Sequence, residues 1–217
     1  MPLYFRERPA QDIELGIWHC TEDPDALIST LILDPEERRI FSEIHNESRR
    51  KQWIGCRMAL VTLLRTKRLM IRYTPSGKPR LIDPPTDISL SHCGEYAAAI
   101  ISRRYQVGID LERIRKKIER VADRFLEEDD LSTVGTEERL AKLTVCWGIK
   151  EAIYKVFGEP EIDIKRHITI GQFDYLCHGS CTLEVRVQTP HGVTHVPVTY
   201  KRIVNYILVY AWNRSIL

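Results

Sequence analysis

The order in which helical and strand-forming segments follow one another constrains this chain most. Between residues 71 and 112 the sequence carries short apolar runs separated by turn-forming residues, which predicts consecutive strands. Four more strand-like runs lie between residues 168 and 212, while helical patterns occur before residue 71 and between residues 113 and 158. Because helices and strands are grouped and do not strictly alternate, we expect an α+β fold with mainly antiparallel sheets.

The helices are expected from their caps and their apolar spacing. Asp23-Pro24 and Asp34-Pro35 each combine an N-cap residue with proline at the first helical position, so a helix should follow each pair. Gly158 and Pro160 should end a long helix. The other expected helices cover residues 48–69, 114–125 and 136–157.

The strands are expected from alternation and from runs of β-branched and aromatic residues. We expect the runs at 96–102 and 107–112 to pair as a hairpin. The other expected strands cover residues 13–20, 88–91, 168–176, 181–188, 194–200 and 206–212.

Composition places the chain among ordinary globular proteins. Its 217 residues are 43% hydrophobic and 29% charged. The longest apolar runs reach about seven residues, against the roughly 20 that cross a membrane, and the N-terminus lacks the pattern of a signal peptide. We therefore expect a cytoplasmic protein whose six cysteines are reduced and mostly buried. Cys177 and Cys181 have no second ligand pair at finger-like spacing, which disfavours zinc.

Charge is distributed unevenly although the net charge is only +2. Residues 38–80 contain twelve Lys or Arg against two acids, and a second basic stretch covers residues 113–124. The segment that follows, residues 127–138, is acidic. This pattern predicts an anionic partner at the basic surfaces, although solvated helix faces account for many of these residues one by one.

Two segments carry a possible phosphoryl-transfer site. In the run Gly108–Glu112, alternation directs Asp110 and Glu112 to one face of a strand. In the run Trp147–Lys155, Glu151 and Lys155 are one helical turn apart. Three carboxylates and a lysine would suit Mg²⁺ bound to a phosphorylated substrate. Judged alone, each segment is equally consistent with structural ion pairs to nearby arginine or lysine.

Two further segments could contact phosphate. In Ser76–Pro79, Gly77 and a proline flank Lys78, which could meet a phosphate as a point charge, although such a sequence is usually only a turn. Ser89 and Ser91 share a strand face and His92 follows them, so hydroxyl and imidazole groups could hold a phosphate. Neighbouring strand positions point apart, which disfavours Ser91 as a nucleophile activated by His92.

Taken together, these segments resemble the 4′-phosphopantetheinyl transferases of the surfactin-synthetase-activating (Sfp) type. The matching pieces are YTPSGKP, SLSH, VGIDLE and WGIKEAIYK, in the order of that family, and PEERRIF and RRKQWIGCRMAL are similar to its N-terminal helices. The family usually has Asn-Ile-Ser-His where this chain has Ser89–His92, so Ser89 is a departure in the nucleotide pocket.

The resemblance implies a fold of two similar α+β halves in pseudo-twofold arrangement, with the active site in the cleft between them. Here the halves would be residues 1–104, with the coenzyme A-binding elements, and residues 105–217, with the metal-binding strand and catalytic helix. The implied activity is transfer of the 4′-phosphopantetheine arm of coenzyme A to a serine of an acyl or peptidyl carrier protein, with release of adenosine 3′,5′-bisphosphate.

The resemblance also assigns roles to residues. Asp110, Glu112 and Glu151 would bind Mg²⁺, Glu151 would take the serine proton, and Lys155 would neutralise the transferring phosphate. The implied coenzyme A contacts are Arg39, Tyr73, Gly77, Lys78, Ser89, Ser91, His92, Asp110 and Lys155.

The expected partners are coenzyme A and an acidic carrier protein, which the basic residues 113–124 could dock, with no nucleic acid and no membrane, and we expect a monomer. Two alternatives stay open: a basic protein that binds a polyanion without catalysis, and another Mg²⁺-dependent phosphoryl enzyme. The moderate isoelectric point, about 8.2, and the lack of exposed-aromatic recognition motifs argue against nucleic acid.

Overall fold

The computed structural model describes residues 3–82, 85–127 and 138–214. The chain divides into two compact units, one ending at Val107 and the other spanning Gly108–Arg214. Each unit contains an antiparallel sheet with helices packed on it, which confirms the expected α+β class. Our assignment of functions to residues 1–104 and 105–217, and their pseudo-twofold relation, stays a prediction.

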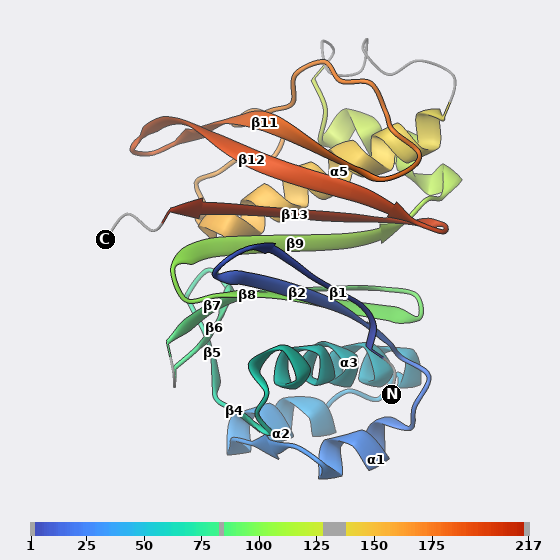
Figure 1. Cartoon of the computed structure of the whole chain (residues 1–217), viewed down its shortest axis with the longest axis vertical. Helices are drawn as coiled ribbons and strands as arrows, with labels where there is room; N and C mark the ends of the chain where they lie inside the picture. Colours follow the sequence, from blue (N-terminus) through green and yellow to red (C-terminus); the bar gives the residue numbers. More distant parts are fainter. Residues whose placement is uncertain (1–2, 83–84, 128–137, 215–217) are drawn as a thin grey trace. The chain divides into compact units, whose positions relative to one another are not determined.

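Three helices lie on one side of the first unit's sheet (Figure 1). They are α1 (Pro24–Ser29), α2 (Pro35–Ser42) and α3 (Glu47–Leu64). Both Asp-Pro pairs act as predicted, because the Asp23 carboxylate accepts from the amide of Asp25 and the Asp34 carboxylate accepts from two amides of α2. No helix in the described part of the chain is long and apolar enough to cross a membrane.

The first sheet has six strands in the order β1-β2-β8-β7-β6-β5, paired antiparallel throughout. Their bounds are β1 (Leu3–Ala10), β2 (Ile13–His19), β5 (Ile71–Tyr73), β6 (Pro79–Leu81), β7 (Thr86–Cys93) and β8 (Tyr96–Ser102). A separate parallel pair joins β3 (Ile32–Leu33) to β4 (Arg68–Leu69). Strand β1 was not predicted; its exposed and half-buried residues alternate along the edge of the sheet.

A core of apolar side chains lies between α3 and this sheet. Leu60 and Ala59 of α3 are fully buried and pack with Ile88 of β7 and Ala97 and Ala99 of β8. The alanines of β8 are small, and this lets the helix pack closely on the strands. The core therefore holds α3 against β7, the strand that carries Ser89, Ser91 and His92.

The second sheet has the order β10-β11-β12-β13-β9. The strands are β9 (Tyr105–Arg113), β10 (Ile168–Thr169), β11 (Ser180–Thr189), β12 (Gly192–Ile203) and β13 (Tyr206–Arg214). Figure 1 shows α5 (Arg139–Phe157) lying along this sheet. The predicted stripe on α5, which includes Val145, Ile149 and Ile153, is fully buried against the strands. This confirms the interpretation of that stripe as core.

Three predicted elements differ from the structure. The hairpin of residues 96–102 with 107–112 is wrong, because β8 pairs with β2 and β7 while β9 joins β13 in the other sheet. Helix α3 ends at Leu64 instead of 69, since Arg65 adopts the left-handed conformation that terminates a helix. The predicted strand 168–176 is regular only over Ile168–Thr169.

The basic segment after β9 also differs. We predicted an α-helix over residues 114–125, and the structure has the 3-10 helix η1 (Lys116–Arg124). Ala122 of η1 is still buried in the core, as are Phe125 and Leu126 directly after it, and Ile118 and Val121 pack against that core partly buried. The predicted start of the following helix at residue 136 lies outside the described residues.

Candidate active site

Strand β9 positions the two carboxylates of its motif. Ile109 and Leu111 are 0% and 2% exposed, as expected for positions that face a core. Asp110 is only 5% exposed, whereas Glu112, near the end of the strand, is partly exposed. A carboxylate buried this deeply needs a cationic neighbour, because desolvation of an ionised group is costly.

Two glycines allow the strand motif and the helix motif to meet. A Cβ on Gly108 would lie 1.9 Å from the carbonyl oxygen of Ala152, so β9 and α5 are in backbone contact here. A Cβ on Gly148 would lie 2.5 Å from a methyl carbon of Val209 and 3.7 Å from the Oδ2 of Asp110. Glycine is needed at both positions because any side chain would push α5 off the sheet.

Lys155 supplies the cation for Asp110. Its Nζ donates to Oδ1 of Asp110 at 2.9 Å and to the carbonyl oxygen of Ile109 at 3.0 Å. The side chains are 26% and 8% exposed, so the pair is largely sheltered but the ammonium still reaches the surface. The structure therefore joins the two motifs by a direct ion pair between residues 45 positions apart.

The carboxyl of Glu151 interacts electrostatically with Lys155, Asp110 and Glu112. Burial raises the pKa of its carboxyl, Lys155 opposes that shift, and the negative charges of Asp110 and Glu112 add to it. Burial is the main cause of the raised pKa, and repulsion from the Asp110 and Glu112 carboxylates is a smaller contribution. A bound cation would relieve this repulsion.

A preformed metal centre is not present among the described residues, because no group of three or more His, Cys, Asp or Glu side chains is arranged to hold a metal ion. The donor set nevertheless fits Mg²⁺ in kind, since carboxylate oxygens are its preferred protein ligands. As observed, Asp110 binds the ammonium of Lys155 and Glu112 accepts from the amide of Arg113 at 3.0 Å. The metal site of Asp110, Glu112 and Glu151 stays a prediction.

A pocket of about 610 Å³ opens beside Glu112. Trp147 and Phe125, whose rings meet edge to face at 5.1 Å, contribute to its apolar lining, and Ile164 lies on the loop after α5. The remaining lining residues are Arg113, Arg115, Lys117, Ile118, Val121 and Arg124. An apolar interior with basic residues around it suits a ligand that has an apolar chain and an anionic end.

In the first unit, the turn predicted at residues 76–79 is present. The amide of Gly77 donates to the carbonyl of Thr74 at 2.8 Å, and Gly77 has φ +83°, which requires glycine for an unstrained turn. Lys78 is buried, however, and its Nζ donates to Oδ2 of Asp87 at 2.9 Å. Burial lowers the pKa of Lys78 although Asp87 opposes the shift. Its contact with phosphate stays a prediction.

The Ser-His segment lies on β7. Ser89 and Ser91 are buried on one face, while His92 points to the α3 side, where the guanidinium of Arg49 contacts its ring. His92 follows Asp87 by five residues of extended strand, or roughly 17 Å at 3.3–3.4 Å per residue. The structure therefore does not bring the imidazole of His92 to the ion pair of Lys78.

The other predicted contacts are on α2 and β5. Arg39 is exposed and pairs with Glu43 at 2.6 Å. The Tyr73 hydroxyl, in contrast, enters a buried network with Glu37 and Arg57. Sequence reasoning missed these two residues, although an arginine inside the apolar stripe of α3 was a possible signal.

Lys150 was missed as well. It is 0% exposed, and its Nζ donates to the carbonyl oxygens of Lys165 and Ile168. The lysine thereby ties the loop after α5 to the middle of the helix. Lysines on helices are usually solvated, and no sequence pattern indicates that Lys150 is buried while its neighbours Glu151 and Lys155 are not fully buried.

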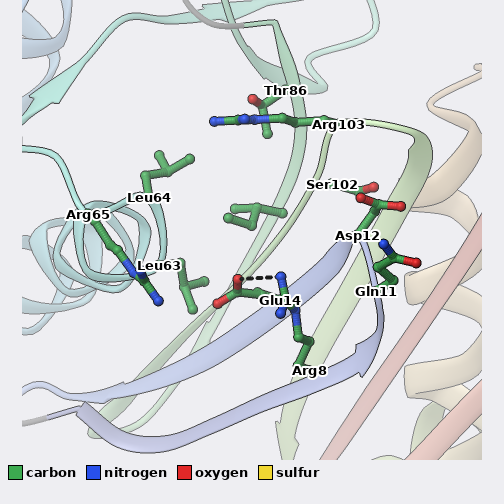
Figure 2. A pocket seen from close by; sticks show the side chains of 11 residues that line it. Arg8, Gln11, Asp12, Glu14, Leu63, Leu64, Arg65, Thr86, Ser102 and Arg103 are labelled. Atoms are coloured by element: carbon green, nitrogen blue, oxygen red, sulfur yellow. Dashed lines mark ion pairs between the residues drawn. The ribbon is translucent and has the colours of Figure 1, made fainter.

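A second pocket, of about 250 Å³, contains none of the predicted site residues. Figure 2 shows its lining, in which Arg8 pairs with Glu14 at 3.6 Å, while Arg65 and Arg103 come from the end of α3 and from the turn after β8. Its lining contains both acidic side chains, Asp12 and Glu14, and the basic side chains of these arginines. The candidate active site is therefore not this pocket.

Comparison with known proteins gives one consistent family. Residues 106–196 match the model of the 4′-phosphopantetheinyl transferase superfamily. A Synechocystis protein described as a 4′-phosphopantetheinyl transferase is 27% identical over 158 residues, which are 66% of this chain and 64% of that protein. The 4′-phosphopantetheinyl transferase gsp of Aneurinibacillus migulanus is 29% identical over 94 residues, 42% of this chain and 39% of gsp.

The 4′-phosphopantetheinyl transferase AcpT of Salmonella typhimurium is 25% identical over 182 residues, which cover 77% of this chain and 94% of AcpT. The chain spans less than two thirds of the length of the Synechocystis and Aneurinibacillus relatives. The matched region contains α5 and all of β9 but its first residue, and so includes Asp110, Glu112, Glu151 and Lys155.

Proposed function

We propose that the chain is a 4′-phosphopantetheinyl transferase, which transfers the phosphopantetheine arm of coenzyme A to a serine of a carrier protein; the match of residues 106–196 to the model of that superfamily and the similarity to AcpT support this. The observation that carries the proposal is the joining of Asp110 and Lys155 beside Glu151 where β9 meets α5. We further propose the surfactin-synthetase-activating type, in which one chain supplies both α+β halves.

In the proposed reaction the carrier serine hydroxyl attacks the phosphorus that bears the pantetheine arm. The serine proton passes to Glu151, directly or through one water. The phosphoanhydride bond to the nucleotide breaks, and adenosine 3′,5′-bisphosphate leaves with the electron pair. In the metal-free protein burial raises the pKa of Glu151, which makes its carboxylate a stronger base than an exposed glutamate.

Asp110, Glu112 and Glu151 would hold Mg²⁺, which when bound would neutralise charge on the diphosphate. Lys155 would exchange part of its bond to Asp110 for the transferring phosphate, because its ammonium is already close to the surface. The proposed coenzyme A contacts of the first unit are Arg39, Tyr73, Gly77, Lys78, Ser89, Ser91 and His92.

The pocket beside Glu112 offers a place for the pantetheine arm. The arm is covalently joined to the phosphate that would lie at the carboxylates, so it must start near Glu112. The pocket walls formed by Trp147 and Phe125 are apolar, as the arm requires. The exposed basic residues of η1, among them Lys116 and Arg120, would then meet an acidic carrier protein from outside.

Incubation with coenzyme A, Mg²⁺ and an apo carrier protein tests the proposal. Mass spectrometry should show a gain of one phosphopantetheine on the carrier serine, lost when the serine is replaced by alanine or when EDTA removes the metal. No gain with fatty-acid, polyketide and peptide carriers would refute it. Hydrolysis of coenzyme A without transfer would indicate a different Mg²⁺-dependent phosphoryl enzyme, and binding of polyanions without turnover a non-catalytic protein.

A further inference from the structure

A fully buried ion pair joins α2 to α3 in the first unit. The guanidinium of Arg57 donates from Nε to Oε2 of Glu37 at 2.8 Å and from one terminal nitrogen to Oε1 at 3.0 Å. The two side chains are 4% and 1% exposed. The guanidinium also lies over the Trp53 ring, 3.6 Å from its centroid. Every side of the pair is thus occupied by protein.

Tyr73 of β5 completes this network. Its hydroxyl accepts from Arg57 at 2.9 Å and donates to Oε1 of Glu37 at 3.3 Å. Tyr73 as a whole is 44% exposed, so its hydroxyl is anchored inside the protein while part of the residue reaches the surface. Burial alone would lower the pKa of Arg57, but the hydrogen bonds and charge of Glu37 outweigh it, so the pKa is raised and the guanidinium stays charged.

Stability alone is a weak reason for such a network. Taking two charges out of water is costly, and their mutual attraction does little more than offset that cost. What a bidentate pair does provide is a defined geometry, because the planar guanidinium fixes both partners at once. The network therefore sets the positions of the elements that it joins.

Those elements carry proposed nucleotide contacts. Glu37 is on α2 two residues before Arg39, and Tyr73 is the last residue of β5, directly before the turn that contains Gly77 and Lys78. A second link runs in parallel, because the guanidinium of Arg72 on β5 donates to Asp34, the N-cap of α2.

We propose that Arg57 is a positioning residue for coenzyme A: through Glu37 and Tyr73 it fixes α2 and the turn after β5 at the distance that the nucleotide phosphates require. The inference rests on the proposed function. Arg57 is too deeply buried to touch the nucleotide itself, so it acts only through its two partners.

Calorimetric titration with coenzyme A and Mg²⁺, together with steady-state kinetics, tests this role. Tyr73→Phe removes only the hydroxyl and should weaken coenzyme A binding about fivefold, the equivalent of about one hydrogen bond. Arg57→Lys keeps the charge but loses the bidentate geometry, and should weaken binding about tenfold. For Arg57→Lys, a residue too deeply buried to contact the nucleotide, the turnover number at saturating coenzyme A and the KM for the carrier should stay within about twofold.

The double variant tests whether Arg57 and Tyr73 affect coenzyme A binding through the same interaction or independently. If Arg57 acts through Tyr73, Arg57→Lys with Tyr73→Phe should bind coenzyme A no more weakly than Arg57→Lys alone. Thr199→Val serves as a control, because it removes a buried hydroxyl bonded to Thr182 at 2.9 Å in the second unit and should leave coenzyme A affinity unchanged.

Coenzyme A affinity unchanged in a folded Tyr73→Phe protein would overturn the inference while leaving the proposed function in place. A parallel loss of coenzyme A affinity, turnover and carrier affinity that follows the loss of thermal stability would also overturn it, since it would show a merely structural role. If the wild-type protein does not bind coenzyme A, the proposed function fails and this inference fails with it.

Discussion

Lys155 donates to the Oδ1 of Asp110 at 2.9 Å, so the last lysine of the helix motif is bonded to the first carboxylate of the strand motif. The same ammonium also donates to the carbonyl oxygen of Ile109 at 3.0 Å. Both bonds fix α5 on β9 at a single register. The ion pair of Lys155 and Asp110 therefore stabilises the fold, in addition to its proposed role in catalysis.

Replacing Lys155 by methionine should therefore affect both stability and activity. Asp110 would keep its negative charge in a buried site, which should lower the free energy of unfolding by about 1–3 kcal/mol, less than for a fully buried pair because the ammonium is partly exposed. We expect turnover to fall about 100-fold or more, since no cation would neutralise the transferring phosphate. Urea denaturation and the carrier assay measure the two effects, and the exposed Lys67→Met is the control.

Gly108→Ala should destabilise the protein by disturbing the packing of α5 on β9. Its Cβ would lie 1.9 Å from the carbonyl oxygen of Ala152, so α5 must shift, and we expect a loss of about 1–3 kcal/mol of stability. Gly171→Ala is the matched control, because no heavy atom lies within 4 Å of the added Cβ and stability should hold. Equal stability of the two variants in denaturant titrations would show that the contact between β9 and α5 is not tight.

Glu151→Gln should abolish most turnover and yet stabilise the metal-free protein. Burial raises the pKa of Glu151 above its ordinary 4.5, so at pH values between the ordinary and the raised pKa the folded state holds a proton that the unfolded state has lost. The free energy of unfolding must then fall as the pH rises through this interval. Glutamine removes the effect, so the variant should be more stable than wild type at neutral pH and equal to it near pH 3.

Thermal or urea unfolding from pH 3 to 8, in EDTA, measures that difference. A variant less stable than wild type at neutral pH would show that Glu151 has favourable partners in the folded state. Turnover close to that of wild type would rule out Glu151 as the base.

Reversing the charge of Lys116 and Arg120 should weaken carrier binding selectively. Both are exposed on η1 and lie outside the lining of the pocket beside Glu112, so their reversal should leave the affinity for coenzyme A unchanged. We expect the KM for an acidic carrier to rise about tenfold, and the wild-type KM to rise with salt as the charges are screened. The same charge change at Arg68, exposed in the first unit, is the control. A parallel rise in the KM for coenzyme A would contradict this assignment.

Local rules were sufficient wherever the determining contacts are close in sequence. The caps at Asp23 and Asp34 start their helices as predicted, because an N-cap bonds to amides two or three residues away. The buried stripe of α5 follows from spacing alone. The α+β class also followed from the sequence, since the grouping of elements is visible without their pairing.

Strand pairing depended on tertiary structure. Residues 96–102 and 107–112 are separated by a short connection that suits a hairpin, yet β8 belongs to the first sheet and β9 to the second, where its neighbour is β13 near the end of the described residues. Hydrogen bonding between strands depends on which edges are free after the core forms, and that is a long-range property.

The candidate site divides in the same way. The sequence by itself determined which residues carry charge on one strand face and on one helix turn, because periodicity fixes the direction of neighbouring side chains. Only the tertiary structure decided which charges meet: Lys155 with Asp110, Lys78 with Asp87, and Arg57 with Glu37. Those pairs are set by burial, since a charge removed from water must find its partner wherever the fold places one.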